Sequence, residues 1–381
     1  MTLGTGRVYI MNETLFGKTS GRETMKIIVC IITFCGIGAV PGLSCSPEYN
    51  CKSPDCRCFT ENAIPGGLAP KDVPQMVVVT MDYALNSEYN ELYDQMFQTI
   101  NPNDCPVVGT FFLQDQYTDY DIVKSYYDRG FEIGISSTNG KLPTSTTEWI
   151  NMIKSVKNRM VSAGIKSEDI RGYRAPQLAF GGNAEFVGIG NNNLVYDAGC
   201  VTSEYDTEST FKWPFTYDHV PGVNCNGQSA PIDRPFPGKW QVLIPDIKFD
   251  QTICEVPQGC ANVHTKKDAF DLLYDNFVEH YEGDRTPYFL IIDPEWIITD
   301  FKRDGTVEFL HYIRAAFQDV YLVTVWQMLQ WVNHPTPIAN ITSFQPWSCH
   351  HQQDVVRSDE LRYRGRNFFE EFTMKEKKEL P

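Results

Sequence analysis

Three residues able to do acid–base or ion-pair chemistry stand at the ends of apolar runs. Asp82 ends the run 77–82, whose three consecutive valines are typical of a buried parallel strand. Arg174 and Asp293 end two further apolar runs in the same way. Because the carboxyl ends of parallel strands meet at one edge of a sheet or barrel, we expect these groups to gather at one mouth.

Each of these groups has a structural interpretation beside a chemical one. Asp82 with Arg174 is either a general base with its orienting partner or a structural ion pair. Asp293 is either an acid or a tolerated polar residue. Asp82 and Asp293 together resemble the carboxylate pair of a glycosidase, but nothing else in the sequence supports glycoside cleavage.

Strand-like and helix-like runs alternate along most of the chain. Strands are expected over 77–82, 107–113, 131–137, 170–174, 194–197, 240–244, 288–293 and 320–325. Helices are expected over 88–99, 119–129, 146–163, 267–281, 306–317 and 325–332. This alternation indicates βαβ units, and the absence of a GxGxxG motif after the first strand favours an α/β barrel over a dinucleotide fold. The segment 201–239, rich in Pro, Gly, Asp and aromatics, indicates a long loop insertion over the mouth.

Composition and cysteine usage indicate a secreted protein. The net charge of -15 over 381 residues argues against a nucleic-acid partner, which would require a basic face. Residues 25–44 have the short basic start and apolar stretch of a signal peptide; a signal anchor is the rival interpretation. We therefore expect an extracellular protein with no membrane contact after signal removal. Asn340 stands in a glycosylation sequon.

Ten cysteines remain outside the signal peptide, an even number that predicts up to five disulfides of unspecified pairing. They are Cys45, Cys51, Cys56, Cys58, Cys105, Cys200, Cys225, Cys254, Cys260 and Cys349. A zinc knuckle at 45–58 is the alternative for the first four, although no histidine lies nearby in the sequence.

The chain is accordingly divided into five segments. They are an upstream extension (1–24), the signal peptide (25–44), a cysteine-rich arm and linker (45–74), the barrel (75–335) and a C-terminal tail (336–381).

Several motifs between about residues 45 and 349 resemble the polysaccharide deacetylases, the NodB homology domain of carbohydrate esterase family four, and most closely the arthropod chitin deacetylases. Specific only as a set, they are Pro54-Asp55-Cys56-Arg57-Cys58, Ile64-Pro65-Gly66-Gly67-Leu68, Thr80-Met81-Asp82-Tyr83, Asn101-Pro102-Asn103-Asp104-Cys105, Gly109-Thr110-Phe111-Phe112, Arg174-Ala175-Pro176, Gly181-Gly182-Asn183, Tyr196-Asp197 and Val325-Trp326-Gln327.

This resemblance implies a distorted (β/α) barrel and hydrolysis of the N-acetyl group of chitin, a carbon–nitrogen non-peptide bond. In the family a divalent metal, usually zinc, is held by one Asp and two His. A second Asp is the base, matched here by Asp82, and a late His is the acid. The metal is needed because the pKa of water is about 15.7 in bulk and about 7 on a metal.

The sequence departs from this family pattern at the metal ligands. Tyr83 replaces the ligand Asp, and Ser136 and Gly140 replace the two ligand histidines. Asp293 stands where the acid His is expected, and Gln177 replaces a Tyr of the third motif. We therefore expect no metal or other cofactor, and we interpret Asp82, Arg174 and Asp293 as vestigial, with Asp82 and Arg174 forming a structural ion pair.

The energetic consequence of these substitutions is large. Losing the drop in the pKa of water raises the barrier by as much as about 12 kcal/mol, at about 1.36 kcal/mol per pKa unit. A single acid or base contributes only about 10²–10⁴-fold, which does not offset that loss.

Aromatic residues near predicted strand ends offer surfaces on which sugar rings stack, although any one of them is as readily a core residue. The predicted ligand-binding residues are Tyr83, Tyr173, Gln177, Trp240 and Trp296.

The function we predict is binding of chitin or a related N-acetylglucosamine polymer in an extracellular matrix, without deacetylation. The alternative is an active hydrolase, metal-dependent or with a rebuilt site of Asp82, Ser136 and Asp293. A third possibility is a structural or signalling partner without glycan affinity.

Overall fold

A curled sheet of parallel strands organises the described part of the chain. The computed structural model describes residues 45–203, 205, 210–223, 225 and 231–349. The predicted extension, the signal peptide and the part of the tail beyond residue 349 lie outside these residues. No helix among the described residues has the length and hydropathy needed to cross a membrane.

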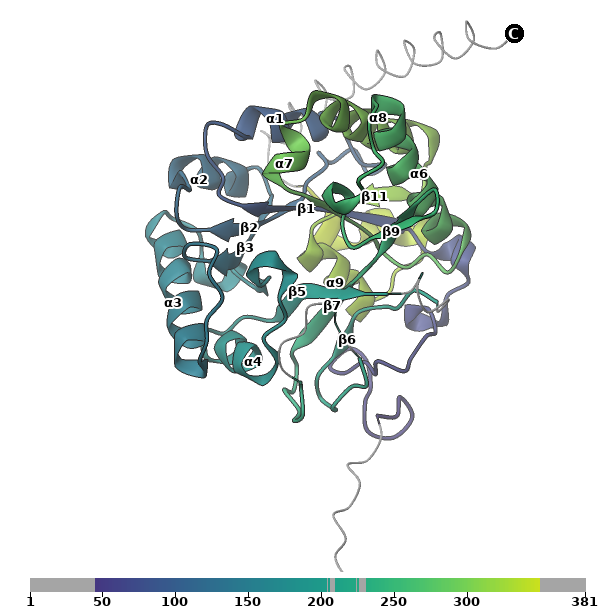
Figure 1. Cartoon of the computed structure of the whole chain (residues 1–381). Helices are drawn as coiled ribbons and strands as arrows, with labels where there is room; N and C mark the ends of the chain where they lie inside the picture. The colour runs from purple at the N-terminus through teal and green to yellow at the C-terminus, as the bar shows by residue number, and fades with distance from the viewer. Residues whose placement is uncertain (1–44, 204, 206–209, 224, 226–230, 350–381) are drawn as a thin grey trace, which may run out of the picture. The chain divides into compact units, whose positions relative to one another are not determined.

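The main sheet has nine strands and forms an open barrel (Figure 1). Its order is β10-β1-β2-β3-β4-β5-β7-β6, and β11 pairs with the start of β1. Neighbours are parallel except β6 and β7, which are antiparallel. The strands are β1 (Gln75–Tyr83), β2 (Thr110–Gln114), β3 (Glu132–Ser137), β4 (Gly172–Tyr173), β5 (Tyr196–Thr202), β6 (Phe215–Thr216), β7 (Trp240–Pro245), β10 (Tyr288–Ile292) and β11 (Val320–Leu322). A separate hairpin joins β8 (Ile247–Phe249) to β9 (Thr252–Cys254).

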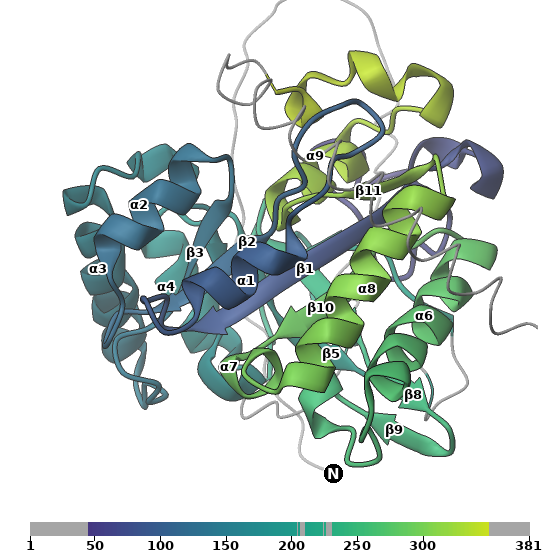
Figure 2. The ribbon, with the colours of Figure 1, turned by 90° about the horizontal axis from the view of Figure 1, so that it is seen from above.

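Helices cover the outer face of the sheet, and α6 and α8 lie side by side (Figure 2). The helices are α1 (Asn90–Met96), α2 (Tyr120–Asp128), α3 (Thr146–Ser162), α4 (Gly182–Asn191), α6 (Lys266–Glu282), α7 (Pro294–Ile297), α8 (Asp300–Ala316) and α9 (Val325–Asn333). The last of these, α9, packs against the inner face instead, where Trp331 and Met328 join the interior core.

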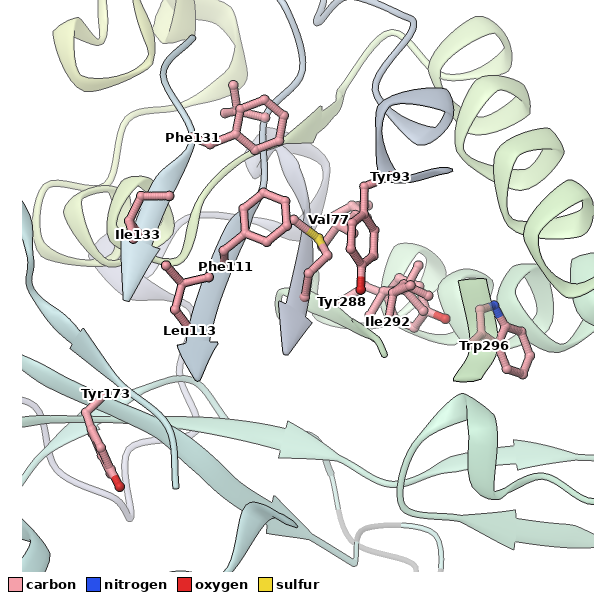
Figure 3. Packing of buried hydrophobic residues seen from close by; sticks show 14 of the residues in the cluster. Val77, Tyr93, Phe111, Leu113, Phe131, Ile133, Tyr173, Tyr288, Ile292 and Trp296 are labelled. Atoms are coloured by element: carbon pink, nitrogen blue, oxygen red, sulfur yellow. The ribbon is translucent and has the colours of Figure 1, made fainter. Parts of the chain in front are cut away.

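The two faces of β1 show how the strand places its polar residue. Val77 and Val79 pack into the core under the outer helices, part of which Figure 3 shows. Met76 and Val78 pack inward with α9. Since successive side chains of a strand alternate between its faces, Asp82 shares the inward face with Met76 and Val78. Its position near the end of β1 then places it at the mouth of the barrel.

All eight predicted strands are present, with bounds that differ by a few residues. The predicted insertion 201–239 contains β6, and β5 runs to Thr202, beyond its predicted end. Of the helices given above, α4 and α7 were not predicted, and α8 begins six residues before its predicted start at 306.

Five disulfides join the ten predicted cysteines, and those of the arm exclude the zinc knuckle because disulfide sulfurs are not thiolate ligands. The pairs are Cys45–Cys58, Cys51–Cys56, Cys105–Cys349, Cys200–Cys225 and Cys254–Cys260.

Both chain segments flanking the barrel are attached to it. The buried Arg57 of the arm donates to Ala63 O at 2.6 Å, and Thr216 N of β6 donates to Arg57 O at 2.9 Å. At the other end, Ile341 and Trp347 are buried, and the Cys105–Cys349 bond fixes the segment that contains them. The described part of the predicted tail therefore packs on the barrel.

Candidate functional site

A cavity of about 150 Å³ opens at the carboxyl ends of the strands. Its walls come from the ends of β1, β2 and β3, from the loop after β4 and from the turn after the β8–β9 hairpin. The lining residues are Asp82, Tyr83, Gln114, Ser136, Ser137, Ala175, Pro176, Gln177, Leu178, Glu255, Val256, Gln258 and Ile291.

The ion pair of Asp82 and Arg174 lies at this cavity. Arg174 Nη1 contacts Asp82 Oδ1 at 2.9 Å and Thr80 Oγ1 at 2.8 Å, while its Nε donates to Ala198 O at 2.6 Å. The guanidinium also lies 4.3 Å from the centre of the Phe112 ring. Burial raises the pKa of the Asp82 carboxyl, and the positive charge of Arg174 opposes that rise. The arginine is thus held by four groups, which favours a fixed structural pair.

Asp293 has a local structural role beside the mouth. Its Oδ1 accepts a hydrogen bond from Trp296 N at 2.8 Å and so caps the first turn of α7. Burial raises the pKa of this carboxyl, while the bond from Trp296 N opposes the rise. Asp293 is not among the residues that line the cavity.

Three residues of the cavity wall have left-handed backbone conformations. Tyr83, Gln177 and Leu178 have φ angles of 76°, 57° and 55°. They account for three of the eight non-glycine residues with positive φ in the described structure. Such conformations cost about 1–3 kcal/mol each and cluster at ligand sites. The sequence contains no signal for them, since none of the three is Gly, Asn or Asp.

Comparison with known proteins assigns the family. No family model matches the chain. Chitin deacetylase 8 of Bombyx mori is 32% identical over 308 residues, which cover 76% of this chain and 78% of that protein. The chain belongs to the chitin deacetylase family. Chitin deacetylase 1 of Bombyx mori is 28% identical over 319 residues, covering 78% of this chain and 58% of that protein.

Among solved structures, the chain is similar to the peptidoglycan deacetylase PdaC of Bacillus subtilis, with 16% identity and a TM-score of 0.39, covering 74% of this chain and 100% of that one. The family membership confirms the predicted resemblance to the chitin deacetylases. The fold is accordingly the distorted (β/α) barrel of the polysaccharide deacetylases, with a disulfide-rich arm before it.

The metal expected in the chitin deacetylase family does not fit the residues at the three positions that the sequence resemblance assigns to its ligands. Tyr83 is 43% exposed and lines the wall, and burial together with the charge of Asp82 raises the pKa of its phenol. Ser136 offers only a hydroxyl. At Gly140, a β-carbon would lie 2.9 Å from Gln114 Oε1. Zinc prefers Cys, His and carboxylate ligands. These positions supply instead the neutral phenol of Tyr83, the hydroxyl of Ser136 and, near Gly140, the side-chain amide of Gln114.

Groups of three or more potential metal ligands within the described ranges all contain disulfide-bonded cysteines of the arm. None of them lies at the mouth.

The predicted ligand-binding residues separate into two groups. Tyr83 lines the cavity, as does Gln177. Tyr173, Trp240 and Trp296 instead lie in the core with exposed fractions of 0%, 5% and 0%. Figure 3 shows two of these three, Tyr173 and Trp296, among the buried residues. The structure therefore corrects their assignment: these three side chains have no accessible face on which a sugar ring can stack.

Several other residues of the cavity wall were not predicted from the sequence. Gln114 and Ser137 end β2 and β3, so the rule that placed Asp82 applies to them equally. Glu255, Val256 and Gln258 approach from the turn that the Cys254–Cys260 bond closes. Their position depends on that disulfide, whose pairing the sequence did not specify.

Proposed function

We propose that this member of the chitin deacetylase family binds chitin or a related N-acetylglucosamine polymer without removing its acetyl groups. One observation carries the proposal. The cavity at the mouth contains the carboxylate of the Asp82–Arg174 pair and a strained wall, and the positions that the sequence resemblance assigns to metal ligands are Tyr83, Ser136 and Gly140.

The size of the cavity suits one substituent of a sugar ring. Pockets for drug-sized ligands measure about 300–1,000 Å³, and this cavity measures about 150 Å³. An acetamido group is a substituent of suitable size and polarity. The rest of the polymer would then lie outside the cavity, across the exposed part of Tyr83.

The chemistry of the wall also suits a neutral amide. Gln114, Gln177 and Gln258 contribute carboxamides, and Ser136 and Ser137 contribute hydroxyls. These groups both donate and accept hydrogen bonds, as does an acetamido group. The charges of Asp82 and Arg174 match each other, and Glu255 is the other charged residue among those that line the cavity.

The same residues support catalytic silence. The Asp82 carboxylate is engaged by Arg174, and the Asp293 carboxylate caps a helix. Neither arrangement supplies the drop in the pKa of water that is worth up to about 12 kcal/mol.

An extracellular matrix is the setting that we propose. Five disulfides within the described ranges suit an oxidising compartment. The predicted signal peptide, the exposed sequon residue Asn340 and the chitin deacetylases among its relatives support the same setting.

Sedimentation with chitin beads tests this function. The purified protein is expected to sediment with the beads, and Tyr83→Ala is expected to weaken binding by about tenfold because the loss of one stacking ring costs about 1 kcal/mol or more. Tyr117→Ala is the matched control, since Tyr117 is 75% exposed, has a φ of 72° and does not line the cavity. A wild-type protein that stays in the supernatant would overturn the proposal and favour a partner without glycan affinity.

A further inference from the structure

Gln114 lines the cavity, and its carboxamide oxygen lies close to Gly140. It is the last residue of β2 and pairs in register with Ser137 of β3, directly after a register shift between Leu113 and Gln114. Such a shift re-aims the side chain that follows it. As a result the Gln114 side chain lines the cavity together with Ser136 and Ser137.

The space that a side chain at position 140 would need is filled by the Gln114 carboxamide. A β-carbon on Gly140 would lie 2.9 Å from Gln114 Oε1, closer than real β-carbons come to other atoms. Gly140 also has a φ of 77°, which side chains rarely adopt, and its N donates to Ser137 Oγ at 2.8 Å. The left-handed backbone therefore disfavours a side chain at position 140, and the amide of Gln114 lies where such a side chain would begin.

The backbone of Gln114 is held firmly, while its carboxamide is held loosely. Thr118 Oγ1 donates to Gln114 O at 2.5 Å. The Gln114 Nε2 donates to Gln116 O at 3.4 Å, beyond the usual range for a good hydrogen bond. A ligand can compete for this amide without breaking a strong bond.

We infer that Gln114 determines the selectivity of the mouth for an acetamido over an ammonium substituent on the sugar; this inference rests on the proposed function. A carboxamide pairs reciprocally with an acetamido group, since each has one carbonyl acceptor and N–H donors. An ammonium group has donors only, so it pairs with the carbonyl oxygen of Gln114 and leaves the NH₂ of Gln114 without an acceptor. A carboxylate at position 114 would reverse this preference, because it accepts only and carries a negative charge.

Calorimetric titration with two defined probes tests the inference. The probes are the fully acetylated and the fully deacetylated chitin pentamer, at a pH at which the amino sugar carries its ammonium charge. The wild type is expected to prefer the acetylated pentamer by about tenfold, the value of one or two net hydrogen bonds. Gln114→Glu is expected to shift the ratio of affinities toward the deacetylated pentamer by about 100-fold, through loss of one pairing and gain of a charged one.

Gln116→Glu is the matched control, because it adds the same charge two residues away on an exposed side chain that does not line the cavity. The ratio of its affinities for the acetylated and the deacetylated pentamer is expected to stay at the wild-type value. Gln114→Ala provides a second variant should Gln114→Glu fail to fold, and it is expected to lose the preference without reversing it.

The possible failures are distinguishable. A wild type that binds neither pentamer overturns both the proposed function and this inference. A wild type that binds the acetylated pentamer, with Gln114 variants that keep the wild-type ratio, overturns the role of Gln114 alone.

Discussion

At the residue scale, the mouth depends on the buried guanidinium of Arg174. Its side chain is 1% exposed and that of Asp82 is 18% exposed. Arg174→Met is expected to destabilise the fold by about 3–5 kcal/mol, because it leaves the Asp82 carboxyl buried beside no positive charge. Urea unfolding measures this loss.

Arg159→Met is the control for Arg174→Met. The Arg159 side chain is 63% exposed, and its Nε lies 3.3 Å from Asp115 Oδ1. Exposed pairs contribute at most about 1 kcal/mol. Equal losses for the two variants would show that the Asp82–Arg174 pair is not the fixed buried pair described above.

Two neighbouring buried carboxyl groups, those of Glu185 and Asp197, are expected to make the stability of the fold depend on pH. Gly181 N donates to Glu185 Oε2 at 2.6 Å, and Gln241 Nε2 donates to Asp197 Oδ2 at 2.6 Å. Burial and the neighbouring Asp197 raise the pKa of Glu185 well above its ordinary value of 4.5. The folded protein therefore opposes ionisation of the Glu185 carboxyl more strongly than the unfolded chain does.

The sign of this effect follows from proton linkage. Above about pH 4.5 the unfolded chain releases the Glu185 proton while the folded chain keeps it, so stability falls by up to about 1.4 kcal/mol per pH unit. Glu185→Gln removes this proton, and its advantage over the wild type is expected to grow from about pH 5 to about pH 8. Urea unfolding at both pH values measures this difference in stability. Glu168→Gln, at an exposed position, is the control. An advantage that is the same at both pH values would contradict the raised pKa of Glu185.

The strand-end rule predicted the mouth correctly for Asp82 and Arg174 but misplaced three aromatic residues, for physical reasons. Tyr173 immediately precedes the inward-facing Arg174, so alternation turns it outward under the helices. Trp240 begins β7 and therefore lies at the opposite edge of the sheet from the mouth. Trp296 lies beneath α8, where its Nε1 donates to Thr306 Oγ1 at 2.8 Å.

At the element scale, glycine explains why two helices were missed or shortened. The glycine-rich α4 has low helix propensity, yet Gly188 lets it pack closely on Ile153 and Trp149 of α3. Gly305 lies inside α8, where a β-carbon would be 2.6 Å from Lys266 O of α6. Close packing between helices thus requires glycine at these positions, whereas a sequence pattern interprets the same glycines as interruptions of a helix. The short helix α7 did carry a signal, the Asp-Pro start at Asp293.

The turn after the β8–β9 hairpin, which forms one wall of the cavity, yields a prediction at this scale. The Cys254–Cys260 bond closes a loop of six residues in sequence separation. Replacing both cysteines by serine is expected to cost about 2 kcal/mol of stability, following the loop-entropy relation, and also to weaken binding of the acetylated pentamer. Binding would weaken because Glu255, Val256 and Gln258 lose their fixed position. Unchanged affinity would show that this wall does not contact the ligand.

At the scale of the whole molecule, the Cys105–Cys349 bond joins positions that are 244 residues apart in sequence. The same relation gives a cost of about 5 kcal/mol for its removal by a double serine variant. The bond lies away from the mouth, so the affinity for the acetylated pentamer is expected to stay at the wild-type value. Thermal unfolding measures the loss of stability, and calorimetric titration measures the affinity for the acetylated pentamer. A loss of stability smaller than that of the Cys254–Cys260 variant would contradict the long-loop argument.

Release of acetate in the presence of zinc tests the central claim, a mouth that recognises the polymer but lacks a metal centre. The purified protein is incubated with an acetylated chitin oligomer and added zinc, and free acetate is measured over time. We predict acetate at the level of a protein-free blank. Sustained acetate release that a chelator abolishes and zinc restores would contradict the account.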